Sequence, residues 1–133
     1  MAGKKLAVLL VDDSRTVLAQ IEKVVIDSEE AEIVGTAGNG AEAIQKASEL
    51  KPDLVIMDIV MPDIDGLAAL RMLQAKQPEI RVAMLSSVGG MASKAEEAFR
   101  LGAVQVLGKP VDADALEALL AQECARSGAG AEG

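Results

Sequence analysis

The chain has 133 residues, half of them apolar, and a formal net charge of −8, so it has the size of one domain with a real core and lacks the basic surface that nucleic-acid binding needs. With no histidine, one cysteine (Cys124) and one aromatic residue (Phe99), it cannot form an internal disulfide, a histidine-based catalytic site or an aromatic stacking surface for bases. No apolar run reaches the length of a membrane span or of a signal-peptide core, and we expect a cytoplasmic protein without membrane insertion.

Five short apolar runs alternate with five segments of helical periodicity along the chain. The first run, KLAVLLV, is typical of a strand buried on both faces, because its apolar residues are continuous rather than alternating. In chain order, the expected strands are residues 5–11, 32–37, 54–57, 80–85 and 104–107. The apolar faces of the helices that follow them begin at Val17, Ala43, Leu67, Ala95 and Leu116.

Capping and breaking residues mark the ends of these helices. Asn39-Gly40 separates the second strand from the second helix, and Gly102 is the expected end of the fourth helix. We expect Ala95, Ala98 and Phe99 in that helix to face the core. The expected N-caps are Ser14, Asp65 and either Asp112 or Asp114.

The alternation predicts an α/β fold, a doubly wound parallel sheet with helices on both faces and right-handed crossovers. We expect one domain over residues 5–124, followed by a flexible, glycine- and alanine-rich tail at residues 125–133. The sequence fits a complete single-domain protein and a domain of a longer chain equally well. In open sheets of this kind, the functional site lies at the carboxyl ends of the strands.

Polar residues follow four of the five expected strands. Asp12-Asp13 comes after the first, Asp58 after the third, Ser86 after the fourth and Lys109 near the end of the fifth. Taken singly, such aspartates are usually turn formers or helix caps, and a lone lysine is usually solvated. Their occurrence at the strand ends of one sheet favours a functional site.

These residue types together suit phosphoryl chemistry. Three carboxylates in one crevice repel each other unless a cation joins them, and Mg2+ prefers oxygen ligands and leaves room for phosphate. A hydroxyl and a lysine across the crevice could bind phosphoryl oxygens. A carboxylate can also act as the nucleophile and form an aspartyl phosphate.

Several segments resemble the receiver domain of bacterial response regulators in two-component signalling. They are VLLVDDS at residues 8–14, DLVIMDIVMPDIDG at 53–66, MLSS at 84–87, and Gly102-Ala103 followed by Lys109-Pro110. The Asp-x-x-Met-Pro-x-x-Asp-Gly pattern is specific, and the resemblance covers residues 5–124. It implies the flavodoxin-like fold with strand order 2-1-3-4-5. The Ser-Ser pair is also similar to that of chemotaxis methylesterase receivers.

The resemblance implies a metal-assisted phosphoacceptor site. Asp58 would accept the phosphoryl group. Asp13, Asp58 and the backbone carbonyl of Val60 would bind Mg2+ directly, and Asp12 would act through metal-bound water.

The resemblance assigns switching and structural roles to residues around this site. Ser86 would be the switch hydroxyl that moves toward the phosphoryl group, and the small Ser87 would keep the site open. Lys109 would contact the phosphoryl oxygens. Gly66 and Pro110 would be structural, and the bond before Pro110 is usually cis in the family.

The chain departs from the family pattern at Val106, where a Tyr or Phe is common. A valine cannot make the large ring rotation of those residues, so we expect the signal to be carried by displacement of residues 86–101, where Gly89-Gly90 is easily remodelled. Val60 and Val88 flank the approach of the hydrolytic water in the family. Because both are apolar, we expect a long-lived phosphoryl state.

The implied partners are other signalling proteins. The phosphoryl donor would be a histidine kinase or histidine phosphotransfer protein, since the chain has no histidine of its own. The signal would pass to a downstream target protein or effector domain through the Ser86–Lys109 region and the last two helices. We expect no direct nucleic-acid binding and no enzymatic turnover beyond slow self-dephosphorylation.

Three other interpretations compete with this one. A degenerate receiver, which binds partners without phosphorylation, is supported chiefly by Val106. A haloacid-type phosphatase would have its two aspartates two residues apart and a cap domain, whereas here Asp12 and Asp13 are adjacent. An FMN carrier would need aromatic residues and a Ser/Thr/Gly-rich phosphate loop after the first strand.

Overall fold

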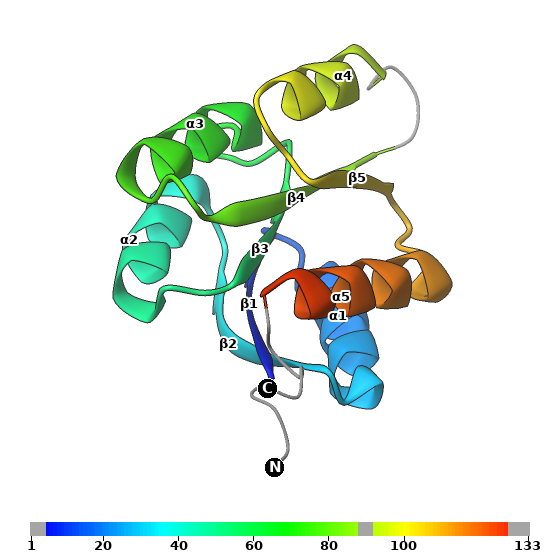
Figure 1. Ribbon diagram of the computed structural model, residues 1–133. Helices are drawn as coiled ribbons and strands as arrows, with labels where there is room; N and C mark the ends of the chain where they lie inside the picture. The colour runs from blue at the N-terminus through cyan, green and yellow to red at the C-terminus, as the bar shows by residue number, and fades with distance from the viewer. Residues whose placement is uncertain (1–4, 88–91, 128–133) are drawn as a thin grey trace.

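The computed structural model describes residues 5–87 and 92–127. Its centre is a five-stranded parallel sheet in the order β2-β1-β3-β4-β5 (Figure 1). The strands are β1 (Leu6–Val11), β2 (Ala31–Ala37), β3 (Leu54–Asp58), β4 (Arg81–Ser86) and β5 (Gln105–Gly108). This confirms the flavodoxin-like architecture expected from the sequence.

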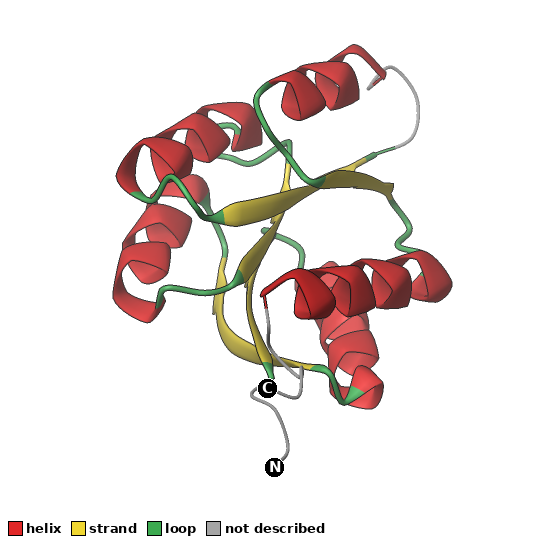
Figure 2. Cartoon of the chain, in the orientation of Figure 1, coloured by secondary structure: helices red, strands yellow, loops and turns green. Residues whose placement is uncertain are grey.

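Five helices cover the two faces of the sheet (Figure 2). They are α1 (Arg15–Ser28), α2 (Gly40–Leu50), α3 (Gly66–Lys76), α4 (Ala92–Arg100) and α5 (Ala113–Ser127). Helices α1 and α5 lie on one face, while α2, α3 and α4 lie on the other. The strand order reverses at β1 and β3, which are direct neighbours, so their carboxyl ends meet at one edge.

Each face of the sheet has its own apolar core. All five residues of β3 are buried, which explains the continuous apolar run that predicted it. Along that strand, Val55 and Met57 pack toward α2, α3 and α4, and Leu54 and Ile56 pack toward α1 and α5. The sheet is therefore held rigidly on both sides, and the loops at its carboxyl end project from a fixed base.

Most of the expected helix ends are confirmed. Ser14 accepts a hydrogen bond from Val17 N–H (3.3 Å), and Asp65 accepts one from Ala68 N–H (2.9 Å). At the last helix, Asp112 is the cap, since it accepts from Ala115 N–H at 3.2 Å. Asp114, the alternative cap, lies within the first turn of α5. Gly102 follows α4 with a φ of +108°, as expected for a glycine that ends a helix.

The expectation that Phe99 faces the core is wrong, because 49% of this residue is exposed. Helix α4 approaches the sheet through Ala98, which is fully buried as expected. Successive helical residues are about 100° apart around the axis, so Phe99 turns away when Ala98 faces inward. Val106, the departure from the family pattern, is partly buried against the core on the side of α2, α3 and α4.

Each strand differs from its expected bounds by one residue at one or both ends, and α5 continues to Ser127, three residues past the predicted domain end. The rest of the predicted tail, residues 128–133, and the loop residues Val88 and Gly89-Gly90 lie outside the described residues. Among the described helices, none has the length and apolar character needed to cross a membrane.

Candidate functional site

Three carboxylates converge at the carboxyl edge of the sheet, where β1 and β3 end side by side. Asp12 and Asp13 follow β1, and Asp58 is the last residue of β3. One carboxylate oxygen from each lies within 4.8 Å of the others. Asp12 and Asp58 are almost fully buried, at 1% and 5% exposure, whereas Asp13 is open to solvent. The three carboxylates therefore lie close together, as expected from their positions at the ends of neighbouring strands.

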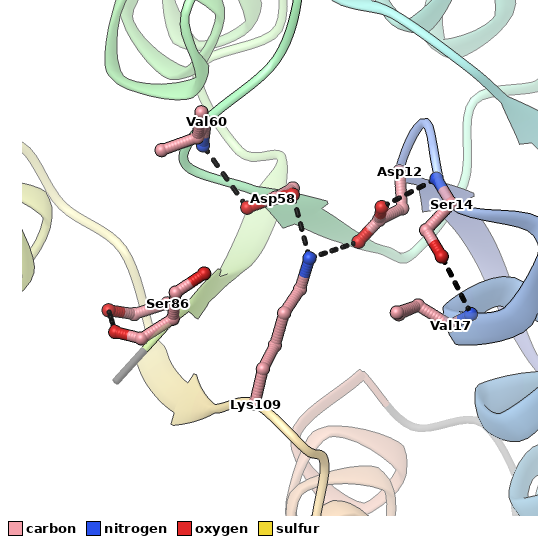
Figure 3. Close-up of polar contacts among 8 residues, drawn as sticks. Asp12, Ser14, Val17, Asp58, Val60, Ser86 and Lys109 are labelled. Atoms are coloured by element: carbon pink, nitrogen blue, oxygen red, sulfur yellow. Dashed lines mark hydrogen bonds and ion pairs between the residues drawn. The ribbon is translucent and has the colours of Figure 1, made fainter. Parts of the chain in front are cut away.

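Lys109 enters this cluster from the loop after β5 and joins the two buried carboxylates (Figure 3). Its Nζ lies 2.7 Å from Asp58 Oδ2 and 2.8 Å from Asp12 Oδ2. The start of the loop is fixed by a 2.8 Å bond from Lys109 N–H to the Ser86 carbonyl, and the following bond to Pro110 is cis, as expected. The lysine side chain therefore reaches across the crevice from a held backbone.

The electrostatics of Lys109 follow from this placement. Burial disfavours its charged form and is the largest single influence on its pKa. The hydrogen bond to Asp58, the close contact with Asp12 and the negative charges of both carboxylates together outweigh burial and raise the pKa of Lys109 above its ordinary value. Lys109 is therefore a cation at neutral pH, positioned beside the proposed acceptor.

Asp12 retains an open binding position. Its Oδ1 accepts a hydrogen bond from Ser14 N–H at 2.9 Å, which orients the carboxylate. Its Oδ2 forms the ion pair with Lys109 but accepts no hydrogen bond of good geometry among the described residues. A buried carboxylate oxygen in this condition has unused capacity for a cation or for a water bound to one.

Asp58 is held by the loop that follows it. Its Oδ1 accepts a hydrogen bond from Val60 N–H at 3.1 Å. The loop closes on itself where Gly66 N–H donates to the Ile59 carbonyl at 2.6 Å. A Cβ at position 66 would lie 2.3 Å from the Asp58 carbonyl oxygen, so only glycine permits this closure. This gives a physical reason for the structural role predicted for Gly66.

Ser86 and Ser87 lie at the end of β4, beside the acidic cluster. Ser86 is buried, and its hydroxyl donates to the carbonyl of Ser87 at 3.3 Å rather than to a site carboxylate (Figure 3). Ser87 is exposed. The predicted switch hydroxyl is thus near the site and, among the described residues, is engaged only in a long local hydrogen bond.

The donor set suits Mg2+. It consists of three carboxylates, one of them exposed and one with an unused oxygen. The loop that follows Asp58 adds the backbone carbonyl of Val60 as a further oxygen donor. Hard oxygen ligands with access to water are what this ion prefers. Asp12 and Asp13 also open onto a hollow of about 490 Å³ between α1 and the start of α2, which leaves room for hydration.

A second hollow of about 490 Å³ lies at the opposite end of the sheet, where Arg81 and Glu123 are among its lining residues. The acidic cluster is at the other edge, so hollow size does not identify the site. The carboxylate geometry does.

Sequence reasoning missed Asp63, which lies in the loop after β3. Its two carboxylate oxygens accept hydrogen bonds from Gly40 N–H (2.8 Å) and Ala41 N–H (3.0 Å) at the start of α2. No local pattern could reveal this contact, because the partners are 22 and 23 residues away. Asp63 reads in the sequence as an ordinary loop aspartate.

Comparison with known proteins gives a consistent result. The family model described as the response regulator receiver domain matches residues 8–121. The chain is 43% identical over 115 residues to the chemotaxis protein CheY of Listeria monocytogenes, covering 86% of this chain and 95% of that protein. It is 40% identical over 103 residues to a protein-glutamate methylesterase/protein-glutamine glutaminase of Myxococcus xanthus, covering 77% of this chain but only 30% of that protein.

A solved structure of similar shape is the response regulator domain of Thermotoga maritima CheB. It superposes with a TM-score of 0.77 at 35% identity, covering 90% of this chain and 94% of that chain. The chain thus spans nearly the whole of the CheY relative and about a third of the methylesterase.

Proposed function

The chain belongs to the response regulator receiver domain family, and from this premise we propose that Asp58 accepts a phosphoryl group from a phosphohistidine in a Mg2+-dependent reaction. The donor would be a histidine kinase or a histidine phosphotransfer protein. One observation carries the proposal. The buried Asp58 carboxylate lies 2.7 Å from Lys109 Nζ and within 4.8 Å of the oxygens of Asp12 and Asp13.

In the proposed step, an Asp58 carboxylate oxygen forms a bond to phosphorus as the phosphorus–nitrogen bond to the donor imidazole breaks. The bonding electron pair leaves with the imidazole nitrogen. Lys109 is positioned to exchange its contact with Asp58 Oδ2 for a contact with a phosphoryl oxygen. Asp13, Asp58 and the Val60 carbonyl would bind Mg2+ directly, and Asp12 would act through metal-bound water. When bound, the ion would offset the negative charge that gathers on the phosphoryl oxygens.

The output would be a change in protein–protein contacts. The Ser86 hydroxyl has only a 3.3 Å bond to the Ser87 carbonyl to give up before it can donate to the phosphoryl group. We propose that the resulting displacement is read by a target protein or effector domain through the Ser86–Lys109 region and helices α4 and α5, without direct nucleic-acid contact.

A direct test is intact-mass measurement after incubation with acetyl phosphate and Mg2+. We expect wild type to gain the mass of one phosphoryl group and Asp58→Asn to gain none. Asp27→Asn, which makes the same chemical change at an exposed position on α1, is the matched control and should be phosphorylated like wild type. Phosphorylation of Asp58→Asn to the wild-type extent would contradict the proposal.

We also propose slow loss of the phosphoryl group, with no catalytic turnover of other substrates. The Val60 side chain is 56% exposed beside Asp58 and offers no polar atom to orient a water. Val60→Asn should therefore shorten the phosphoryl lifetime, which can be followed by the decay of the phosphorylated mass. Equal or slower decay in the variant would refute this part. The same role for Val88 stays a prediction, since that residue lies outside the described part of the chain.

A further inference from the structure

The loop between Asp58 and α3 is tied to a neighbouring helix as well as to its own base. Asp63, near the middle of this loop, accepts hydrogen bonds from Gly40 N–H at 2.8 Å and Ala41 N–H at 3.0 Å. The first N–H groups of an α-helix have no partners within the helix. One carboxylate therefore bridges two of the free donors of α2, and it comes from the loop that carries Val60.

Helix α2 already has local caps. Asn39 accepts from Glu42 N–H at 2.8 Å, and Glu42 in turn accepts from Gly38 N–H at 2.9 Å. The arrangement differs from a capping box only in that Glu42 accepts from the residue before the cap instead of from the cap itself, and it stabilises the start of the helix in a similar way. The contact from Asp63 adds to a helix end that its own sequence already stabilises, so its consequence lies chiefly in where the loop is held.

The steric fit supports the same conclusion. A Cβ at Gly40 would come within 2.9 Å of Ile64 Cβ and 3.0 Å of the Ile64 carbonyl oxygen. Glycine at this position lets the loop and the helix approach more closely than any other residue would allow. The loop is thus fixed at two places, at its base by Gly66 and on its outer side by Asp63 and Ile64.

We propose that Asp63 is a positioning residue for phosphorylation: by binding the start of α2, it fixes the loop whose Val60 backbone contacts Asp58 and would supply a Mg2+ ligand. The Val60 N–H lies 3.1 Å from Asp58 Oδ1, so a shift of the loop changes the orientation of the acceptor carboxylate. Asp63 itself touches neither the carboxylate cluster nor Lys109 in any described contact. This inference rests on the proposed function of Asp58.

The alternative is that Asp63 is only a helix cap. Removing a residue that is only a cap lowers the stability of α2, but it leaves the Mg2+ dependence of the folded protein unchanged. The chain offers a matched control in Asn39→Ala, which removes the local cap of α2 without touching the loop. Comparing Asp63→Ala with Asn39→Ala therefore separates loop placement from helix stability.

The first measurement is the Mg2+ concentration that gives half-maximal phosphorylation by acetyl phosphate, at a temperature where all variants are folded. We expect Asp63→Ala to raise it by about three- to tenfold, below the ten- to hundredfold typical of residues that hold a metal ligand directly. Asn39→Ala should stay within about twofold of wild type. Asp63→Asn has one acceptor oxygen for two N–H groups and should fall between.

The second measurement does not depend on phosphorylation. The backbone amide resonance of Val60, followed by NMR during a Mg2+ titration, should shift at higher Mg2+ concentration in Asp63→Ala than in wild type or Asn39→Ala. If the Val60 resonance shifts with Mg2+ as expected in all three proteins but wild type cannot be phosphorylated, the proposed function fails, while the role of Asp63 in placing the Val60 loop stands. If Asp63→Ala and Asn39→Ala give the same Val60 titration, the positioning role is refuted.

Discussion

The two ends of the sheet each carry a buried ion pair, and only one of them is complete. At the amino end, Arg81 of β4 donates two hydrogen bonds to Glu123 of α5, at 2.8 and 3.1 Å. At the carboxyl end, a single Lys109 ammonium is shared between Asp12 and Asp58, with Asp13 close by. The first arrangement pairs one carboxylate with one cation, whereas the second sets three carboxylates against one cation.

The difference separates a structural contact from a functional one. Both oxygens of the buried Glu123 accept hydrogen bonds, and these bonds raise the pKa of Arg81 against the opposing effect of burial. Both oxygens of this carboxylate are therefore already engaged. At the carboxyl end, Asp12 Oδ2 accepts no well-formed hydrogen bond among the described residues, and excess negative charge persists. The residual demand for positive charge is what would draw Mg2+ to that end.

The largest expected effect comes from breaking the complete pair. Arg81→Met keeps the aliphatic stem but leaves the Glu123 charge buried and alone. We expect the free energy of unfolding to fall by about 3 kcal/mol, at the lower end of the range for broken buried pairs because the Arg81 side chain is 34% exposed. Urea unfolding would measure this, and the stabilisation by Mg2+ should be unchanged.

The matched control for that variant is Arg71→Met on the exposed face of α3. Its unfolding free energy should stay within about 0.5 kcal/mol of wild type. A loss of less than about 1 kcal/mol in Arg81→Met would mean that Glu123 escapes to solvent and that the pair is not structurally important.

The incomplete cluster should respond to the loss of its cation in a way that Mg2+ can reverse. Lys109→Met leaves Asp12 and Asp58 unpaired, and we expect a loss of about 2 kcal/mol without divalent ions, since the nearby exposed Asp13 and solvent soften the penalty. Saturating Mg2+ should narrow the deficit. The exposed Lys94→Met on α4 serves as control. A deficit that is the same with and without Mg2+ would count against a cation site here.

A smaller change in stability is expected for Asp12→Asn. The amide oxygen can still accept from Ser14 N–H, and one of the crowded negative charges is gone. Without Mg2+ the unfolding free energy should stay within about 1 kcal/mol of wild type or rise above it. The stabilisation by Mg2+, about 2.7 kcal/mol at one hundred times the dissociation constant for an intact site, should largely disappear. Destabilisation beyond about 2 kcal/mol without Mg2+ would show that Asp12 is structural.

The same comparison explains how far the sequence reached. The carboxyl-end cluster was predictable because its members follow strands directly, and parallel strands bring their ends to one edge. The Arg81–Glu123 pair was missed because its members are 42 residues apart and are of types that are usually solvated. The Asp63 contact was missed because its partners, two backbone N–H groups, lie 22 and 23 residues away. Local patterns carry no information on such pairings.

Errors of detail have a similar origin. Ala98 and Phe99 were both assigned to the core face of α4, but adjacent helical residues cannot both face the sheet, and the small Ala98 is the one that does. Asn39-Gly40 was identified only as a break, whereas Asn39 caps α2 and Gly40 allows Ile64 to approach. In both cases the outcome depends on the packing of two elements, which a single segment does not specify.

The smallest expected effect concerns the pH dependence of stability, through Asp63 at the functional end. The hydrogen bond from Ala41 N–H, and then that from Gly40, hold the pKa of Asp63 below its ordinary value. A lowered pKa means that the folded state favours the ionised carboxylate. The contribution of Asp63 to stability is therefore full above the ordinary carboxyl pKa of about 3.9 and is lost as the pH falls through the lowered pKa.

Wild type should accordingly be more stable than Asp63→Asn at pH 7, by a small margin because the carboxylate is exposed. The margin should shrink in acid as Asp63 becomes protonated and its contact resembles that of the amide. Urea midpoints of the two proteins between pH 7 and pH 3 would measure it. A margin that stays constant with pH would show that the negative charge of Asp63 contributes nothing. The loop would then be held against α2 by the close packing of Ile64 on Gly40 and not by the charge of Asp63.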